Sequence, residues 1–452
     1  MRKIIQYMMM ALIAVVLASC ANDISEESTP TVKSNIRFVV DDFPMFEKPS
    51  TRTIGEEDKG KTAWAVGDEI CVKLESKELG TQTATLKYNG VKFEIQDGNS
   101  LCYLDGEPVT AYAYYAPNRK WLNDGNLGYK DGEHDGTAEF LEATCTVHYG
   151  DDNYVDISFA NATRNYSRLR IATIPKTEIK VDADNFAPTD NPNLLYMTYT
   201  LTSDEKGNAY LYGTFDNNSI VTVKYRGASL ATHKFSKKTE NAKSYALDAT
   251  AISANSAEEI NSAIKQEVAD GKTAIRLNIA SDAGDNEFKA IREAFKNVKS
   301  GTIDLTLIGC KEIPADGLND IKALKSIFLP DVTKIGMNAL SYCVNLQEIC
   351  APNVSAIDER AFAGFIMLTK VTLGELTDVR GEANSGGGIF DDDKRILIDL
   401  YLPKNQEVMK GEFDENSNQY IWKPTGESYF ASLDYDNGIF LSYQFNSVKS
   451  WE

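Results

Sequence analysis

Leu324-Lys-Ser-Ile327-Phe-Leu329-Pro330-Asp-Val332-Thr-Lys-Ile335 is followed by Leu346-Gln-Glu-Ile349-Cys-Ala351-Pro352-Asn-Val354-Ser-Ala-Ile357 and then by Leu368-Thr-Lys-Val371-Thr-Leu373-Gly-Glu-Leu376-Thr-Asp-Val379. The three segments begin 22 residues apart and place apolar side chains at the same positions of each period. One period earlier these positions hold Leu305, Leu307, Cys310 and Ile313, and beyond an insertion the pattern returns at Leu400-Tyr401-Leu402-Pro403. A fixed period of this length predicts a solenoid whose coils bury apolar side chains against one another.

The residues between the apolar positions of each strand are predicted to face outward, because successive side chains of a strand point to opposite faces. Five stacked strands, about 4.8 Å apart, give a concave sheet on the order of 20 Å across, which suits a peptide or an oligosaccharide better than a whole protein. Phe328 and Tyr401 are the predicted anchors, with packing beneath the C-terminal segment 420–452 as the alternative. The candidate ligand-binding residues are Asp304, Thr306, Ser326, Phe328, Glu348, Lys370, Thr372, Asp399 and Tyr401.

Two helical segments precede the repeats. Residues 257–268 and 287–298 show helical patterning, and each is followed by an apolar strand, 275–279 and 303–307. Alternating helices and strands predict a parallel sheet with helices on one face. Residues 251–452 are therefore predicted to form an α/β repeat domain with a helical N-terminal cap.

The repeat motif resembles the BspA-type leucine-rich repeat. A proline follows the strand at Pro330 and Pro352, Val and Ile occupy the return segment, and an Ala-Leu or Ala-Phe pair at 339–340 and 361–362 precedes the position of Cys343. The motif lacks the asparagine ladder of ordinary leucine-rich repeats. The resemblance implies a cell-surface protein that binds host matrix or other cells.

The half of the chain before residue 250 is predicted to be all-β. Short runs of β-branched and aromatic residues, such as 109–115, alternate with Gly, Asn and Asp, which is typical of antiparallel sandwiches. The clearest predicted hairpin joins residues 196–201 to 209–213. We expect two β-sandwiches, at 35–165 and 166–250.

This half resembles the fimbrillin-like, or Mfa-like, family of lipoproteins. The motifs that carry the resemblance are Thr51-Arg52-Thr53, Trp64-Ala65-Val66-Gly67-Asp68-Glu69-Ile70, Ala111-Tyr112-Ala113-Tyr114-Tyr115-Ala116-Pro117 and Ser167-Arg168-Leu169-Arg170-Ile171. The resemblance implies two transthyretin-like sandwich modules with a boundary near residues 160–175. It also implies fimbrial subunits that are cleaved after an arginine and polymerise by strand exchange. Arg52 is the candidate cleavage site, or a residue of an ordinary surface loop.

The first 20 residues are predicted to be a lipoprotein signal peptide. Arg2 and Lys3 precede an apolar run, 4–18, which is shorter than the roughly 20 residues of a membrane-spanning helix. The run ends in Leu17-Ala18-Ser19-Cys20, which resembles a bacterial lipobox and makes Cys20 the predicted lipidation site; an ordinary signal peptide with a chance cysteine is the alternative. Residues 21–34 are polar and predict a flexible tether. We expect a lipid-anchored protein of the cell outer membrane, exposed at the surface.

Composition argues against several classes of function. The net charge of -19 and the pI near 4.8 would repel nucleic acid. The three histidines are not at ligand spacing and no catalytic or nucleotide-binding motif is present, so no metal, cofactor or enzymatic activity is expected. The segment from Asp131 to Glu142 mimics an EF-hand but follows a Gly- and Asn-rich stretch, which indicates an acidic loop. The six cysteines after Cys20 show no CxxC spacing and are predicted to be mostly buried, with any disulfide pairing open.

These observations lead to one favoured hypothesis and two alternatives. The chain is predicted to act in cell adhesion or ligand binding through the concave face of its repeats, with an extracellular matrix protein, a host or bacterial cell surface, or a glycan as partner. In the first alternative it is the tip or anchor subunit of a pilus that assembles by strand exchange. In the second it is a surface lipoprotein that captures glycans.

Overall fold

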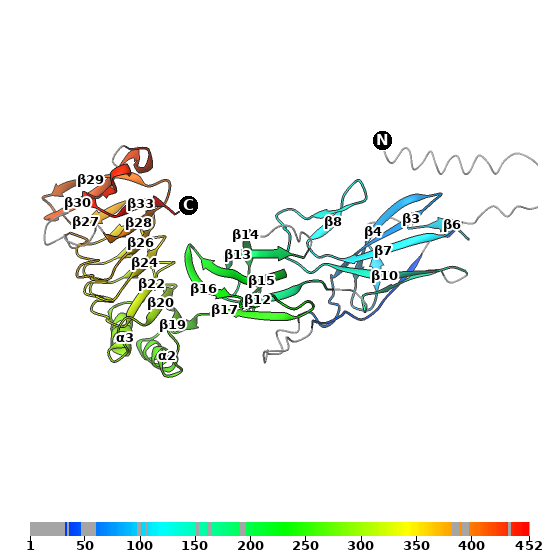
Figure 1. The fold of residues 1–452 in the computed structure, drawn as a ribbon, viewed down its shortest axis with the longest axis horizontal. Helices are drawn as coiled ribbons and strands as arrows, with labels where there is room; N and C mark the ends of the chain where they lie inside the picture. The colour runs from blue at the N-terminus through cyan, green and yellow to red at the C-terminus, as the bar shows by residue number, and fades with distance from the viewer. Residues whose placement is uncertain are drawn as a thin grey trace, which may run out of the picture.

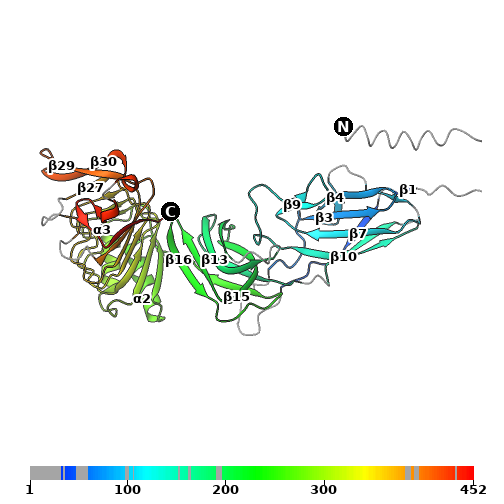
Figure 2. The ribbon, with the colours of Figure 1, turned by 45° about the horizontal axis from the view of Figure 1, so that its top comes forward.

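Three β-rich regions follow one another along the chain, with the first region at one end, the second in the middle and the repeats at the other end (Figures 1 and 2). The computed structural model describes residues 32–33, 36–46, 60–96, 101–104, 106–150, 153–160, 164–189, 196–381, 388–390, 397–432 and 435–451. The predicted signal peptide with Cys20, most of the predicted tether, and Arg52 lie outside these residues. Within them, no helix has the length and apolarity needed to cross a bilayer.

The first β region is a seven-stranded sheet in the order β2-β11-β10-β7-β3-β4-β5. Its strands are β2 (Arg37–Val40), β3 (Glu69–Ser76), β4 (Gly80–Tyr88), β5 (Phe93–Ile95), β7 (Val109–Tyr115), β10 (Leu141–His148) and β11 (Tyr154–Ser158). Because side chains alternate along a strand, Ile70, Val72 and Leu74 of β3 enter the core whereas Lys73 and Glu75 do not. The end strands β2 and β5 contact each other, so the sheet curls around this core.

Two short strand pairs accompany this sheet. β8 (Arg119–Trp121) pairs with β9 (Leu127–Tyr129), and β1 (Val32–Lys33) pairs with β6 (Tyr103–Leu104). β1 falls within the segment predicted as a flexible tether. Pairing with β6 gives the backbone of these two residues hydrogen-bond partners.

The second β region has the strand order β14-β13-β15-β12-β17, with β16 paired to β15. Its strands are β12 (Ser167–Ala172), β13 (Glu178–Pro188), β14 (Tyr196–Thr202), β15 (Asn208–Tyr225), β16 (Ala228–Lys234) and β17 (Ser244–Asp248). The first and last strands of this region, β12 and β17, are parallel neighbours. The first and last strands of the seven-stranded sheet, β2 and β11, are parallel neighbours as well.

The prediction of a hairpin between residues 196–201 and 209–213 is wrong. The turn forms, with the Gly207 N–H donating to the Asp204 carbonyl at 3.0 Å, but β13 lies between β14 and β15. Strands adjacent in sequence are usually neighbours in a sheet, and here the long strand β13 pairs with both and separates them. Local patterning identified the strands and could not identify their partners.

The repeats begin with helices α2 (Ala257–Ala269) and α3 (Asp285–Phe295) at one end of the stack (Figure 1). The Ser256 side chain accepts a hydrogen bond from the Glu259 N–H and caps α2. A parallel sheet consists of β18 (Ile252–Ser253), β19 (Ala274–Asn278), β20 (Ile303–Ile308), β22 (Leu324–Phe328), β24 (Glu348–Ala351), β26 (Lys370–Leu373), β28 (Asp399–Leu402) and β33 (Ser447–Ser450), in that order.

A second sheet runs along the other side of the stack. It consists of the short parallel strands β21 (Glu312–Ile313), β23 (Lys334–Ile335), β25 (Ala356–Ile357) and β27 (Asp378–Arg380), followed by the antiparallel hairpin of β30 (Gln419–Ser428) and β29 (Glu407–Asp414). The 3-10 turns η3 (Tyr429–Ala431) and η4 (Tyr435–Asn437) and the pair β31 (Ile439–Phe440) and β32 (Tyr443–Gln444) complete the C-terminal end. The Trp422 indole N–H donates to the Gly381 carbonyl at 3.0 Å and ties the hairpin to the last coil.

The positions that recur every 22 residues, together with Leu400 beyond the insertion, form the core of the stack. Ile327, Ile349, Val371 and Leu400 are register partners on neighbouring strands, and each is at most 1% exposed. Each of these branched side chains has an apolar neighbour in the adjacent coil, about 4.8 Å away along the stack. The apolar period therefore points inward, as the sequence predicts.

A buried ion pair lies where the chain passes from the first region to the second. Arg164 Nε donates to Glu139 Oε1 at 2.6 Å, and the two side chains are only 4% and 5% exposed. Arg164 also donates to the Pro44 carbonyl at 2.6 Å. One guanidinium thus joins three segments that are distant in sequence.

Ile349→Ala should lower the free energy of unfolding by about 2–5 kcal/mol, because it leaves a cavity in a close-packed stack. Gln347→Ala is the matched control, since the Gln347 side chain is exposed two residues away, and it should change the same quantity by less than about 0.5 kcal/mol. Chemical denaturation monitored by circular dichroism measures both. Equal effects of the two substitutions would contradict the inward position of Ile349.

Candidate functional site

The outward side chains of the parallel sheet form two rows. Strand pairing places Thr306, Phe328, Cys350, Thr372 and Tyr401 side by side in one row. The second row consists of Asp304, Ser326, Glu348, Lys370 and Asp399. The structure therefore brings all nine predicted ligand-binding residues together on one face of the repeats.

Polar side chains in the second row form hydrogen bonds and ion pairs with one another. The Ser326 hydroxyl donates to Asp304 at 2.5 Å, and Lys370 Nζ lies 2.7 Å from Glu348. Burial would lower the pKa of Lys370, but the hydrogen bond and ion pair with Glu348 outweigh burial and raise the pKa above its ordinary value. Lys370 is consequently charged at neutral pH and balanced by its neighbour.

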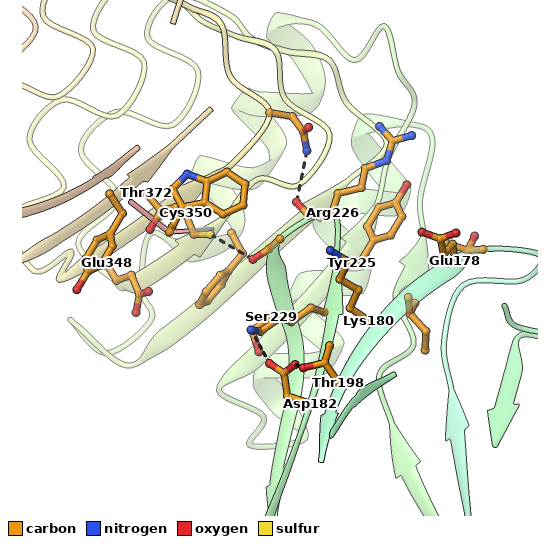
Figure 3. Close-up of a pocket in the computed structure, with 18 of the residues that line it drawn as sticks. Glu178, Lys180, Asp182, Thr198, Tyr225, Arg226, Ser229, Glu348, Cys350 and Thr372 are labelled. Atoms are coloured by element: carbon orange, nitrogen blue, oxygen red, sulfur yellow. Dashed lines mark hydrogen bonds and ion pairs between the residues drawn. The ribbon is translucent and has the colours of Figure 1, made fainter. Parts of the chain in front are cut away.

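The turn between β15 and β16 docks against this face. The Cys350 thiol lies 4.0 Å from the Gly227 carbonyl, and the Asn353 amide donates to the Arg226 carbonyl at 3.4 Å (Figure 3). Gly227 has a φ of +85°, and a Cβ there would lie 3.0 Å from Pro352. Both constraints favour glycine at the tip of the turn.

Asp331 holds the turn to the repeats. Its side chain is 4% exposed and accepts a hydrogen bond from the Gly309 N–H at 2.9 Å. From the second region, the Arg226 guanidinium lies 3.0 Å from the same carboxylate, and the Tyr225 hydroxyl donates to it at 3.3 Å. A buried carboxylate requires such partners, so this contact defines how the two regions meet.

β16, which follows the docked turn, borders two clefts. The larger has a volume of about 1470 Å³ and lies between the repeats and the second β region (Figure 3). The smaller has a volume of about 420 Å³ and includes Arg276 and Asp304. Phe328, Glu348 and Ser229 line both clefts, which makes the clefts neighbours.

Each region contributes one wall of the larger cleft. The repeats provide Phe328, Glu348, Cys350, Lys370, Thr372, Tyr401 and Trp451. The second β region provides Glu178, Lys180, Asp182, Thr198, Lys224, Tyr225 and Ser229. In Figure 3 the labelled residues Glu348, Cys350 and Thr372 lie on one side of the cleft, and those of β13 to β16 lie on the other.

The second wall also contains an ion pair. Lys224 Nζ lies 2.6 Å from Asp182, and the Thr198 hydroxyl donates to Asp182 at 2.8 Å. Burial would raise the pKa of Asp182, but the hydrogen bonds from Lys224 and Thr198 and the charge of Lys224 outweigh burial and hold that pKa below its ordinary value. Each wall of the cleft therefore presents a lysine and a carboxylate held side by side, and the second wall carries Glu178 and Lys180 in addition.

Eight of the nine predicted residues line one or both of the two clefts. Phe328, Glu348, Lys370, Thr372 and Tyr401 line the larger cleft, and Asp304, Thr306, Ser326, Phe328 and Glu348 line the smaller one. Asp399 lines neither of these two clefts and accepts hydrogen bonds from Ser447 and Asn446. Thr306, Ser326 and Thr372 are 3%, 6% and 8% exposed, so they offer a ligand little surface.

Phe328 and Tyr401 are partly exposed at the larger cleft. The C-terminal segment contributes Trp451 to the cleft, and Lys449 places its ammonium group 5.8 Å from the centre of the Tyr401 ring. The Lys370 ammonium group lies 5.7 Å from the same ring centre. The C-terminal segment thus borders the two aromatic side chains and leaves them partly exposed.

Sequence reasoning missed the second wall. Lys180, Asp182 and Tyr225 belong to strands whose patterning indicates only a β-sheet, and no local signal links them to repeats that begin many residues later. A signal was available for Trp451, because Val448 and Lys449 continue the alternation of the repeat strands directly before it.

The described residues contain no group of three or more His, Cys, Asp or Glu side chains suited to a metal ion. In the loop that mimics an EF-hand, Asp131 pairs with Lys120 at 3.3 Å and Asp135 accepts a hydrogen bond from the Tyr129 hydroxyl. No disulfide joins the six cysteines that the structure describes, and burial raises the pKa of Cys350 to about 12. Cys350 is therefore protonated at neutral pH and acts as a small buried side chain.

A family model described as the BspA type leucine-rich repeat region matches residues 286–386 in six copies. This match covers β20, β22, β24 and β26 together with their return segments, and it confirms the leucine-rich repeat prediction for that stretch. No curated protein matches the chain in sequence.

Three similar solved structures each align over most of their own length but over less than half of this chain. A proposed cell adhesion protein from Bacteroides fragilis NCTC 9343 is 10% identical, with a TM-score of 0.27, over 48% of this chain and 92% of that chain. The fimbrial anchor protein Mfa2 from Porphyromonas gingivalis is 11% identical, with a TM-score of 0.20, over 44% and 80%. The shaft pilin SpaA from Lactobacillus rhamnosus GG is 12% identical, with a TM-score of 0.14, over 41% and 92%. These TM-scores are too low to establish a shared fold.

Replacing Asp331 should destabilise the protein more than replacing Arg226. Asp331→Ala leaves the Gly309 N–H and the Tyr225 hydroxyl without their acceptor and should lower the free energy of unfolding by about 1–3 kcal/mol. Arg226→Ala removes a half-exposed guanidinium and leaves Asp331 its hydrogen bonds and the ammonium group of Lys311 at 3.8 Å, so it should cost about 0–1 kcal/mol. Chemical denaturation of both variants gives the ranking, and the reverse order would show that Asp331 does not hold the turn.

Proposed function

We propose that this chain is a surface-attached adhesion protein that binds its ligand in the larger cleft, between a leucine-rich repeat solenoid and the second β region. The observation that carries the proposal is the outward row of the BspA-type repeats, in which Phe328 and Tyr401 are partly exposed on either side of the small residues Cys350 and Thr372. Aromatic side chains bury large areas at little entropic cost and are frequent anchors of binding sites.

In this proposal the two β regions are fimbrillin-like, transthyretin-like modules that hold the repeats away from the outer membrane. Two observations support the assignment of both regions to the same kind of module. Each has its first and last strands as parallel neighbours. Each also has an apolar core separate from the other's, and Ile308 of β20 joins the core of the second region. The lipid on Cys20 attaches the chain to the membrane, and several acyl chains anchor stably where one does not.

The proposal is for binding and not for catalysis. Two of the three carboxylates that line the larger cleft, Asp182 and Glu348, each have a lysine within 2.7 Å; the third is Glu178. A catalytic acid or base needs a perturbed pKa near the working pH. The pKa of Asp182 is shifted in the opposite direction, below its ordinary value.

A fimbrial subunit is the second candidate. β2 is an end strand of its sheet and pairs, within the described part of the chain, with β11 alone. An end strand of this kind can be replaced by a strand from a neighbouring subunit. Negative-stain images of the purified chain distinguish the candidates, because filaments favour strand exchange and single particles favour the adhesion protein.

The double substitution Phe328→Ala and Tyr401→Ala should weaken ligand binding about tenfold or more, the loss expected when aromatic anchors are truncated. The measurement is binding of the chain from Ala21 onward to an array of matrix proteins and glycans, followed by titration of each hit. The matched control is Tyr342→Ala with Phe413→Ala, since these two aromatics are 50% and 58% exposed and line neither cleft. Binding that survives the first pair and not the second would remove the cleft from the proposal.

Cys20→Ser should release the protein from membranes, because the acyl chains are attached through the thiol. Fractionation of cells and incorporation of a labelled fatty acid measure the change. A chain that keeps its label without Cys20 would rule out this attachment site.

A further inference from the structure

We infer that the larger cleft binds an uncharged oligosaccharide. This inference rests on the proposed function and names the ligand class of the same site. It follows from three features of the cleft: the pairing of its charges, the position of its aromatic rings, and the absence of free backbone on its floor.

Paired charges match a ligand that carries hydroxyl groups. Lys224 is held by Asp182 at 2.6 Å, and Lys370 by Glu348 at 2.7 Å. Each pair fixes donors beside acceptors, and a hydroxyl group both donates and accepts hydrogen bonds. A sugar ring with adjacent hydroxyls can bridge such a pair without leaving a buried charge unbalanced.

The electrostatics disfavour an acidic ligand. A polyanion requires a cluster of unpaired cations. In the larger cleft Lys224, Lys370 and Arg226 each have a carboxylate partner, and Lys176 pairs with Glu205. The fifth cation, Lys180, lies near Asp182 and helps to lower the pKa of that carboxylate. The whole chain carries a net charge of -19, which repels polyanions at longer range. A neutral ligand needs no unpaired cations and is not repelled by the net charge.

Aromatic rings supply the apolar contact that a sugar needs. Trp451 is fixed by its indole N–H, which donates to the Leu373 carbonyl at 2.9 Å, and it lines the cleft together with Tyr401 and Phe328. The C–H face of a pyranose ring packs on such rings while its hydroxyls point to polar groups around them. Thr198 and Ser229 place hydroxyl groups on the opposite wall.

The floor of the cleft offers side chains and no free backbone. β22, β24, β26 and β28 each pair with a strand on both sides, so their N–H and C=O groups are used within the sheet. An extended peptide that binds by adding a strand would find no edge there. The repeat wall of the cleft therefore presents side chains to a ligand, which suits a glycan.

The test uses the chain from Ala21 onward on an array that carries neutral and acidic oligosaccharides and matrix proteins. The expected result is binding to a neutral oligosaccharide, confirmed by titration with maltohexaose, cellohexaose, chitohexaose or the array ligand itself. The affinity should change less than about twofold between about 50 mM and about 500 mM salt, because no net charge is neutralised on binding. Binding should also change the fluorescence of Trp451.

Two substitutions locate the ligand. Trp451→Ala and Tyr401→Ala should each weaken binding about tenfold, and Trp451→Phe should retain most of it, since the ring is preserved. Trp121→Phe, in the first β region, is the control for the fluorescence signal and should leave both signal and affinity unchanged. Unfolding midpoints of all variants separate lost binding from lost folding.

Three outcomes would overturn the inference. Binding only to acidic oligosaccharides, with a strong salt dependence, would assign the opposite ligand class. An affinity for a neutral glycan that is unchanged in Trp451→Ala and Tyr401→Ala would place the binding site elsewhere. Binding only to a matrix protein, lost on replacing Phe328 and Tyr401, would end the glycan inference and leave the proposed adhesion function standing.

Discussion

The surface that this chain offers to a ligand depends on one apolar column inside the repeats. Ile327, Ile349, Val371 and Leu400 must remain in register, because a shift of one residue would turn every strand over and expose the column to water. Keeping the column buried fixes the neighbouring residues on the opposite face in rows. The binding rows are thus a geometric consequence of core packing.

Small residues in the first row decide where the second β region can dock. Between Phe328 and Tyr401 the row holds Cys350 and Thr372, which leave space at the centre of the face. The Gly227 turn occupies part of this space, in contact with Cys350. Large side chains at these two positions would displace the turn. The clefts therefore depend on the alternation of large and small side chains along this row.

The sequence predicted the repeats well because their signal is local and repeated. A period of 22 residues identifies the buried positions, and strand alternation then identifies all nine outward residues. The sequence could not predict the strand order β14–β13–β15 or the docking of the Gly227 turn against the repeats. Both depend on contacts between distant segments, such as Arg226 with Asp331, which leave no pattern along the chain. The second wall of the cleft was missed for the same reason.

Charged residues here serve orientation more than stability. At both junctions a buried carboxylate accepts an arginine from another segment: Glu139 from Arg164 and Asp331 from Arg226. Buried ion pairs gain little net free energy over apolar packing, because desolvation offsets their attraction, but a misplaced partner would leave a charge buried and unpaired. Each pair therefore favours one arrangement of its neighbours. Because the larger cleft has a wall from each of two regions, its shape depends on the Asp331 contact as much as on the residues that line it.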